Sequence, residues 1–352
     1  MSAPEVRIDQ LTGGRVLIAP GRAARPDQFG LGAWRGGALG TCQFCEGSEA
    51  ETPPEVDADR SGGSGPDRPG WRTRTVPNLY PAAIPADRSG SAEGQDDSPS
   101  SSAFSSPADP LLASSRAGEP DMFASRPAVG AHEVIINTPR HVGSLGELEP
   151  DELEAAVAAW RRRMLAHADE AYVQLVLNQG PAAGATVEHS HAQLGALNLV
   201  PAAVARERER FNSYRELTAG SSLLGEVLRE EIRRGERLVA IDDEVALVCP
   251  WASRFPYEMR LIPRRPHPSF ERDTGGAEML GRAVAALESA LGRPSQFNIW
   301  VKTAPRGVEH FHWHLDLAPA LEPRASFEMA TGIEINNSSP EAAAAELREK
   351  IA

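Results

Sequence analysis

The 352-residue sequence lacks an excess of positive charge. Lys and Arg number 36 against 49 Asp and Glu, and the formal net charge is −13 at pH 7 with histidine neutral. Proteins that grip nucleic acid through its phosphates carry a basic balance or a basic face. The acidic balance therefore argues against a nucleic-acid partner, and a small anionic ligand would need local Arg, Lys or backbone N–H groups.

Long apolar runs, a signal peptide and a cysteine framework are also missing. No run reaches the roughly 20 apolar residues of a membrane-spanning helix. The first ten residues, MSAPEVRIDQ, have neither the charged start nor the apolar core of a secretion signal. Cys42, Cys45 and Cys249 are too few for a disulfide-stabilised secreted fold. These absences predict a cytoplasmic protein without a membrane partner.

One segment is poor in apolar residues altogether. Residues 87–116, from about Asp87 to Arg116, are rich in Ser, Pro, Gly and Asp. Such a composition buries too little apolar surface to offset the entropy of ordering it. We expect a disordered surface insertion here.

The rest of the chain has the patterning of an α/β mixture. Three segments are predicted to be helices. Residues 150–170 start with acidic residues and carry Arg later, residues 276–292 are amphipathic and end at a glycine, and residues 340–352 have Pro at the likely first turn. Runs rich in Val, Ile, Leu and aromatic residues predict strands at 132–137, 172–178, 244–250, 258–263 and 297–303.

The chain also repeats one order of motifs. A strand ending near Pro139 leads through a helix and a second strand to His189, and Pro263 leads in the same way to His312. The two separations are nearly equal, at 189 − 139 = 50 and 312 − 263 = 49 positions. Matching order and spacing predict two copies of one strand–helix–strand–strand unit in one pseudo-symmetric body.

Histidines gather at the last strand of each copy. In VEHSHAQLGA, 187–196, the period of a strand places His189, His191 and Gln193 on one face. In EHFHWHLDL the same period aligns His310, His312, His314 and Asp316. These stretches hold five of the nine histidines, which favours function, whereas isolated His167 and His267 are more simply structural.

The pair Cys42-x-x-Cys45 has the spacing with which two thiolates hold one zinc ion. Redox dithiols share this spacing, but they sit at a strand–helix unit that is absent around TCQFCEG. Zinc needs two further ligands, and His141 and one histidine of the His-Ser-His stretch are available.

Several ordered motifs together resemble one family, the galactose-1-phosphate uridylyltransferases, which are duplicated members of the histidine-triad superfamily. The matching stretches are LTGGRVLIAPGRAARP, CQFCEGSEAETPPEV, RTVPNLYPA, HEVIINTPRHVGSLGEL, NQGPAAGATVEHSHAQ, PWASRFPYEMRLIPRR and FHWHLDLAP. The resemblance implies an α+β fold of two histidine-triad-like halves, residues 1–200 and 201–352, with a mixed or antiparallel sheet flanked by helices. It also implies a homodimer.

The resemblance assigns roles by position. The second histidine of the family's H-P-H-x-Q motif is the nucleophile and falls on His191, followed by Gln193. The remaining roles are catalytic for Asn178 and Thr186, substrate-binding for Arg22, Arg25, Asn78, Gly180 and Lys302, and zinc-binding for Cys42, Cys45, His141 and His189.

The chemistry of these residues agrees with such roles. A neutral imidazole can attack the α-phosphorus of a nucleotide sugar and form a covalent nucleotidyl-histidine. The leaving sugar phosphate has a second pKa near 6 and departs without a strong acid. Gln193 can donate hydrogen bonds to phosphoryl oxygens but shuttles no proton. Related hydrolases carry a third histidine there, so Gln193 favours transfer over hydrolysis.

Three departures from the family pattern stand out. Ser190 replaces the proline between the two histidines, and Thr186 replaces a serine. Some members bind a second metal through one Glu and three His residues. Glu207, His312 and His314 match three of these positions, but Lys302 occupies the fourth, which leaves a site that is empty, weak or completed by His310. We expect no tightly bound second metal.

The leading hypothesis is a ping-pong exchange of UMP between UDP-glucose and galactose 1-phosphate. The alternative within the same chemistry is an ADP-sugar phosphorylase or a dinucleoside-polyphosphate phosphorylase. A third hypothesis, from another class, is a non-catalytic zinc-stabilised nucleotide-binding protein. The intact His191 and Gln193 count against it, because a binder needs no nucleophile.

Overall fold

A computed structural model describes residues 3–24, 42–60, 62, 64–85, 127–291 and 294–351. The predicted insertion at 87–116 lies outside these ranges. In the parts of the chain that the structure describes, no helix combines the length and apolar character that crossing a membrane requires.

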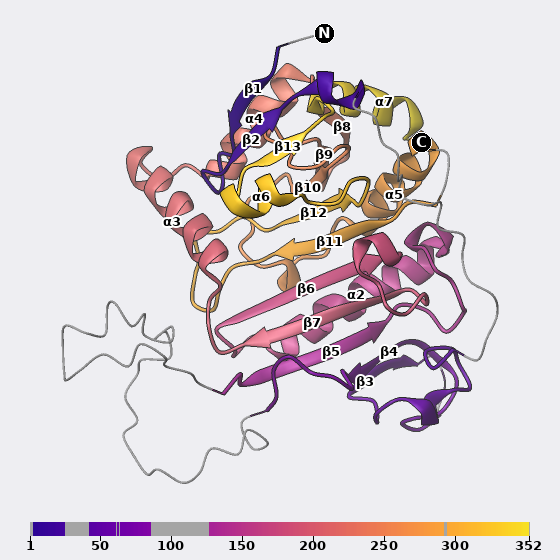
Figure 1. Ribbon diagram of the computed structural model, residues 1–352. Coiled ribbons are helices and arrows are strands. Elements are labelled where there is room, and N and C mark those ends of the chain that lie inside the picture. The colour runs from indigo at the N-terminus through magenta and orange to yellow at the C-terminus, as the bar shows by residue number, and fades with distance from the viewer. Residues whose placement is uncertain are drawn as a thin grey trace, which may run out of the picture.

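A ten-stranded sheet forms the centre of the molecule (Figure 1). Its strands pair antiparallel throughout, in the order β3-β4-β5-β7-β6-β11-β12-β10-β9-β8. Their bounds, in that order, are Asp57–Arg60, Trp71–Pro77, Gly130–Ile136, His191–Leu197, Tyr172–Gln179, Phe297–Lys302, His314–Pro319, Met259–Pro263, Val245–Val248 and Leu238–Ile241.

The sheet is symmetric about its middle. β5, β7 and β6 on one side mirror β10, β12 and β11 on the other, and β6 pairs with β11 at the centre. Asn178 lies opposite Asn298 there, and Leu177 opposite Ile299. The predicted α+β fold with two similar halves is confirmed, because each half contributes the same strand order to one continuous sheet.

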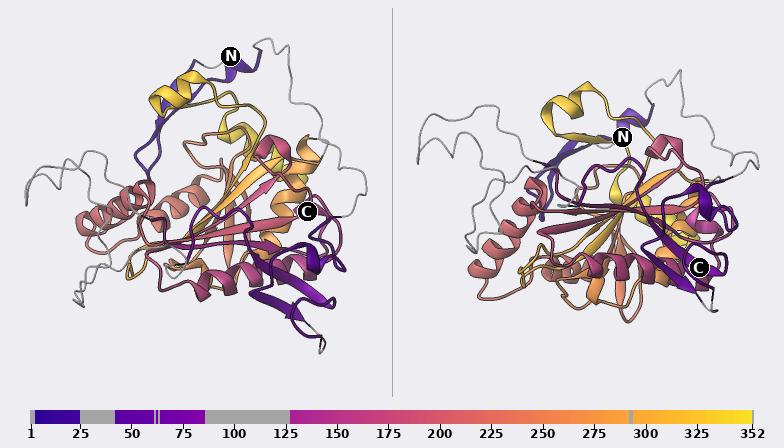
Figure 2. Two further views of the ribbon diagram at one scale, coloured as in Figure 1. Left: turned by 60° about the horizontal axis from the view of Figure 1, so that its bottom comes forward. Right: turned by 90° about the horizontal axis from the view of Figure 1, so that it is seen from below.

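Three predicted helices cover one face of the sheet (Figure 2): α2 (Pro150–Ala166), α5 (Ala277–Leu291) and α7 (Pro340–Lys350). The main core lies between these helices and the sheet. This core includes Trp160 of α2, Leu175, Ala192 and Leu194 of the first half, and Ile299 of the second. Alternate residues of β7 therefore point into this core, and the residues between them point to the opposite face.

The described residues cover the opposite face only in part. α3 (Ala202–Leu217) and α4 (Leu223–Arg234) pack over β9 and β10, where a second apolar cluster includes Phe211, Leu228 and Ile262. A three-stranded sheet joins β1 (Glu5–Ile8), β2 (Arg15–Ile18) and β13 (Glu334–Asn336). Short helices complete the fold: η1 (Pro20–Ala24), η2 (Glu49–Glu51), η4 (Leu145–Glu147), η5 (Pro181–Ala183), η6 (Phe270–Arg272) and α6 (Ser326–Thr331).

Two details differ from the sequence expectations. The histidine-bearing strands begin later than predicted, since β7 starts at His191 and β12 at His314. The residues before His191 bond to loops instead of a strand ladder, as Ser190 N–H donates to the Val142 carbonyl at 2.7 Å. In addition, β13 pairs with β2, so the first strands join the C-terminal end of the chain. The division into 1–200 and 201–352 stays a prediction.

Candidate functional site

His191 and Gln193 lie on the face of the sheet that α2 and α5 leave open. Both alternate along β7 with Ala192 and Leu194, which are buried in the main core. Only 7% of His191 is exposed, whereas Gln193 is half-buried. β7 thus holds a buried imidazole and an amide two residues apart on one polar face, as the sequence predicted.

The surroundings of His191 decide which ring nitrogen is reactive. Its Nδ1 lies 2.7 Å from the carbonyl oxygen of His189, so Nδ1–H is the donor. The lone pair is then on Nε2. Burial lowers the pKa of His191 below its ordinary value, and the imidazole is therefore neutral at pH 7. A neutral ring with its Nε2 lone pair available is the form that acts as a nucleophile.

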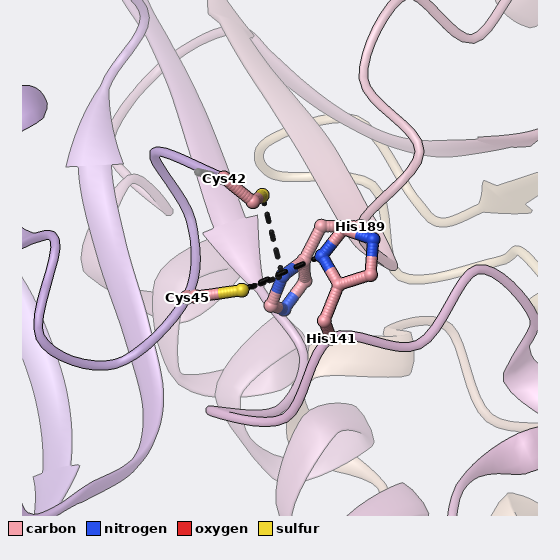
Figure 3. Close-up of side chains that lie close together, drawn as sticks. All are labelled: Cys42, Cys45, His141 and His189. Carbon is pink, nitrogen blue, oxygen red and sulfur yellow. Dashed lines mark hydrogen bonds between the residues drawn. The ribbon is translucent and has the colours of Figure 1, made fainter. Parts of the chain in front are cut away.

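His189 presents the opposite nitrogen. Its Nε2 lies 2.8 Å from the Thr138 carbonyl and donates to it, which leaves the Nδ1 lone pair for another partner. Nδ1 lies 3.7 Å from Cys42 Sγ and 3.6 Å from Cys45 Sγ, and His141 Nδ1 lies 3.4 Å from Cys45 Sγ (Figure 3).

These four side chains form a donor set that fits zinc. One ligand atom from each, two sulfurs and two nitrogens, lies within 4.8 Å of the others. Burial and the neighbouring Cys42 raise the pKa of the Cys45 thiol to about 11, so a pair of thiolates here needs a cation beside it. Two Cys and two His with a hydrogen-bonded His ring are a typical structural zinc site.

Phe44 connects this cluster to His191. It lies between the two cysteines in sequence and is buried. Its ring meets the His191 ring edge-on with centroids 5.3 Å apart, and the His189 ring at 6.3 Å. The Cys-x-x-Cys turn therefore packs directly against the candidate nucleophile.

A set of hydrogen bonds holds Ser190, the residue between the two histidines. Trp160 Nε1–H donates to Asn137 Oδ1 at 2.9 Å, which orients the amide so that Nδ2 donates to Ser190 Oγ at 3.0 Å. The Ser190 N–H bonds Val142, a contact that proline lacks. Side chain and backbone thus hold the turn that separates the two histidines. Sequence reasoning missed Asn137, whose only signal was a polar residue at the end of a buried strand.

Gln193 also has a partner that sequence reasoning missed. Its Oε1 lies 3.1 Å from Nε2 of His132, a half-buried residue of β5. His132 Nδ1 accepts from the Ala82 N–H at 3.0 Å, and the Asn78 N–H donates to the His132 carbonyl at 2.8 Å. The segment around Asn78, predicted to contact a nucleotide, is therefore anchored beside Gln193.

The remaining predicted catalytic residues, Asn178 and Thr186, and the predicted substrate-binding residues Gly180, Arg22 and Arg25 lie around this face or in the loops beside it, except where the structure does not describe them. Asn178 is half-buried near the end of β6, and Gly180 follows with a φ of 81°, where a Cβ would lie 2.6 Å from Gln296 Cγ. Thr186 is exposed in the loop before β7, and Arg22 is exposed on η1. Arg25 lies outside the described residues. Their roles stay predictions.

The second half repeats the histidine geometry without the metal cluster. His312 Nε2 lies 2.8 Å from the Pro263 carbonyl, and His314 Nδ1 lies 3.2 Å from the His312 carbonyl. These contacts match those of His189 and His191 in the first half. Facing His312 Nδ1 at 3.5 Å is the hydroxyl of Ser222, where the first half has a cysteine.

The residues around His314 do not fit a second metal. Glu207 Oε1 lies 3.3 Å from His314 Nε2, and its Oε2 lies 3.7 Å from Lys302 Nζ. Burial raises the pKa of Glu207 to about 7. Lys302 thus brings its ammonium against the carboxylate that a metal would require, and His310 is exposed. Among the described residues, the zinc-type cluster is the one group with metal-binding geometry.

Comparisons with known proteins extend over nearly the whole chain. A family model described as "Galactose-1-phosphate uridyl transferase, N-terminal domain" matches residues 102–201. ADP-glucose phosphorylase of Arabidopsis thaliana is 28% identical over 370 residues, covering 99% of this chain and 93% of the relative. Galactose-1-phosphate uridylyltransferase of Cryptococcus neoformans is 24% identical over 386 residues, covering 98% and 90%.

A solved structure agrees with these relatives. The crystal structure of the Arabidopsis thaliana ADP-glucose phosphorylase with bound ADP-glucose superposes with a TM-score of 0.74 at 26% identity. The superposition covers 98% of this chain and 99% of that one. The likeness therefore spans both halves of the sheet.

Proposed function

We propose that the chain, which is similar to galactose-1-phosphate uridylyltransferases and to an ADP-glucose phosphorylase, is a nucleotidyltransferase-type enzyme that transfers a nucleoside monophosphate through a covalent nucleotidyl-His191. The observation that carries the proposal is the hydrogen bond of His191 Nδ1 to the His189 carbonyl. It leaves the lone pair of a neutral imidazole on Nε2, beside Gln193.

The first step forms a bond from His191 Nε2 to the α-phosphorus of a nucleotide sugar. The bond from that phosphorus to the bridging oxygen breaks, and its electron pair leaves with the sugar phosphate. The ring, now substituted at Nε2 and protonated at Nδ1, is cationic and keeps its bond to the His189 carbonyl. In the second step a phosphate oxygen attacks the same phosphorus, and the electron pair returns to Nε2.

Gln193 meets the phosphoryl oxygens as an amide donor, and Asn178 and Thr186 add a side-chain amide and a hydroxyl. Asn78 contacts the nucleotide, and Gly180 contributes the backbone turn beside it. The cations Arg22, Arg25 and Lys302 receive the phosphates. Lys302 would do so while its ammonium lies near Glu207.

Zinc would be held by Cys42, Cys45, His141 and His189. When bound, it supplies a rigid structural link and takes no part in the bond changes. The protein residues do the positioning, since the His189 carbonyl orients His191 and the Phe44 ring packs against it.

Two substrate pairs are open to this chemistry, and one observation favours each. The motifs of the sequence favour exchange between UDP-glucose and galactose 1-phosphate. The higher identity and coverage of the ADP-glucose phosphorylase relative favour ADP-glucose with inorganic phosphate as the acceptor. We favour the second pair, in a cytoplasmic homodimer.

The test is covalent labelling of the purified protein. Incubation with ADP-glucose should add the mass of one AMP to the intact protein and release glucose 1-phosphate, and UDP-glucose should add little UMP. Subsequent addition of inorganic phosphate should discharge the label as ADP.

The matched control is His191→Ala, which should abolish the label while metal content stays that of the wild type. Preferred labelling by UDP-glucose, discharged by galactose 1-phosphate, would establish the exchange reaction instead. If the folded, zinc-loaded protein takes no label from either nucleotide sugar, the remaining hypothesis is a non-catalytic nucleotide-binding protein.

A further inference from the structure

His132 is tied to the candidate site through both of its ring nitrogens. Nδ1 lies 3.0 Å from the backbone nitrogen of Ala82, and Nε2 lies 3.1 Å from Gln193 Oε1. No motif singled this histidine out, and it contacts the metal cluster at neither nitrogen. It therefore joins the segment around Asn78 to the amide beside the nucleophile.

The partners of His132 decide where its proton lies. The Ala82 N–H can only donate, so Nδ1 carries no hydrogen and accepts. A neutral imidazole then carries its hydrogen on Nε2. Asn78 Nδ2 lies 3.3 Å from Nε2, but Asn78 Oδ1 accepts from the Tyr80 N–H, so Nδ2 is itself a donor. The acceptor left for the Nε2–H of His132 is Gln193 Oε1.

This bond orients the Gln193 amide. With Oε1 held by His132, the amide nitrogen is the group left to face the rest of the site. Within the described ranges it makes no hydrogen bond to the protein. Among the described residues both N–H groups are unpaired and available to a ligand, whereas the carbonyl oxygen is turned toward His132.

We propose that His132 is a positioning residue that keeps Gln193 a hydrogen-bond donor toward the phosphoryl group and thereby favours phosphate over water as the second nucleophile. The inference rests on the proposed function. The terminal oxygens of a sugar phosphate dianion, and three of the four oxygens of the inorganic phosphate dianion, are negatively charged acceptors. Amide N–H groups therefore attract either dianion, and the partial negative charge of an exposed amide oxygen repels it. Water, in contrast, can donate a hydrogen bond to an exposed amide oxygen and be held by it.

The competing reaction is hydrolysis of the nucleotidyl-His191. A water oxygen attacks the phosphorus, the bond from phosphorus to Nε2 breaks, and its electron pair returns to the ring. One proton of the attacking water is released to solvent and the other stays on the new monophosphate. If the Gln193 amide turned over, its Oε1 would orient that water. His132 opposes this turn of the amide, because the turn would break its hydrogen bond to Oε1 and bring two donors together.

Two substitutions separate the two contacts of His132. In His132→Asn, the side-chain oxygen lies near the former Nδ1 and still accepts from Ala82, but no donor reaches Gln193. In His132→Gln, the amide nitrogen extends to the former Nε2 and still donates to Gln193, but the acceptor for Ala82 is lost. The two variants are matched, because each keeps one of the bonds and neither adds a charge.

The measurement is the partition of the nucleotidyl-enzyme. Each protein is labelled with ADP-glucose or UDP-glucose, whichever labels the wild type, and freed of sugar phosphate. The rate of label loss is then followed in buffer alone and with inorganic phosphate or galactose 1-phosphate.

His132→Asn should raise the ratio of hydrolysis to transfer about tenfold, the factor expected for one hydrogen bond of ordinary strength. His132→Gln should keep the wild-type ratio and raise KM for the nucleotide sugar, because the segment around Asn78 is released. Thermal unfolding of both variants checks that they fold alike.

An unchanged ratio in a labelled His132→Asn protein, or an equal shift in both variants, would overturn the role of His132 and leave the proposed function standing. Absence of label in the wild type would overturn the proposed function and this inference together.

Discussion

At the scale of single residues, carbonyl oxygens determine what each histidine can do. His189 donates from Nε2 to Thr138 and presents Nδ1 to the cysteines, whereas His191 donates from Nδ1 to His189 and presents Nε2. Two neighbours of the same residue type therefore offer opposite nitrogens. These bonds support the proposed assignment of metal binding to His189 and attack to His191, and exchanging the two roles would require a different turn at Ser190.

Glu207 leads to a pH-dependent prediction at this scale. Burial raises its pKa in the folded protein from 4.5 to about 7. Between these values the folded state holds a proton that the unfolded state has lost, so the wild type loses stability as pH rises through this window. Glu207→Gln has no such loss. Relative to wild type, the variant should gain roughly 3 kcal/mol between about pH 4.5 and 7 and no more above it.

Urea unfolding of both proteins at several pH values measures this difference. Glu209→Gln, an exposed position on the same helix, is the control and should follow the wild type. A difference between Glu207→Gln and wild type that stays constant with pH would show that Glu207 ionises normally in the folded protein.

At the scale of elements, the pairing of β5 with β7 places the polar residues of the site. β5 begins at Gly130, which has a φ of 149° and lies so close to β7 that a Cβ would stand 2.0 Å from the Ala196 carbonyl oxygen. Only glycine accepts both the backbone angle and the close approach of another strand. The register that brings His132 to Gln193 depends on this approach.

Gly130→Ala should therefore destabilise the protein by roughly 2–4 kcal/mol, from strained backbone and an overpacked ladder. Gly195→Ala is the matched control on β7, since a Cβ there meets nothing within 4 Å. It should change stability little. Denaturant midpoints of the two variants test the difference, and equal midpoints would contradict the account of the β5 start.

Prediction of the elements succeeded where local signals are strong. α2, α5 and α7 follow from their charges, first-turn proline and apolar spacing, and the central strands follow from their β-branched runs. The start of β7 was predicted four residues too early, at 187 in place of 191, because Ser190 N–H bonds the Val142 carbonyl outside the ladder. α3 and α4 were not predicted. α3 carries few apolar residues on any face, so its sequence has no clear apolar periodicity.

At the scale of the whole molecule, the metal cluster joins parts of the chain far apart in sequence. Cys42 and Cys45 come from the N-terminal region, whereas His141 follows β5 and is separated from His189 by α2 and β6. A bound ion therefore closes long loops of chain, and the folded state alone offers the complete donor set.

With free zinc at a thousandfold excess over its Kd, binding should stabilise the folded protein by about 4 kcal/mol relative to the metal-free protein. Removing the metal should remove this contribution. The measurement is the thermal midpoint with and without a chelator, together with metal content, expected to be one zinc per chain. Cys42→Ser should resemble the chelated protein and respond no further to chelator. A midpoint that chelation leaves unchanged would show that the four side chains hold no stabilising metal.

The sequence by itself determined the acidic balance, the Cys-x-x-Cys pair, the spacing of His189, His191 and Gln193, and the repeat that became the two halves of the sheet. The tertiary structure decided which nitrogen each histidine presents, that Asn137 supports Ser190, and that His132 holds Gln193. The physical reason is that proton positions depend on hydrogen-bond partners from other strands and loops. The spacing of residues within one strand does not show which groups of other strands and loops will be their partners.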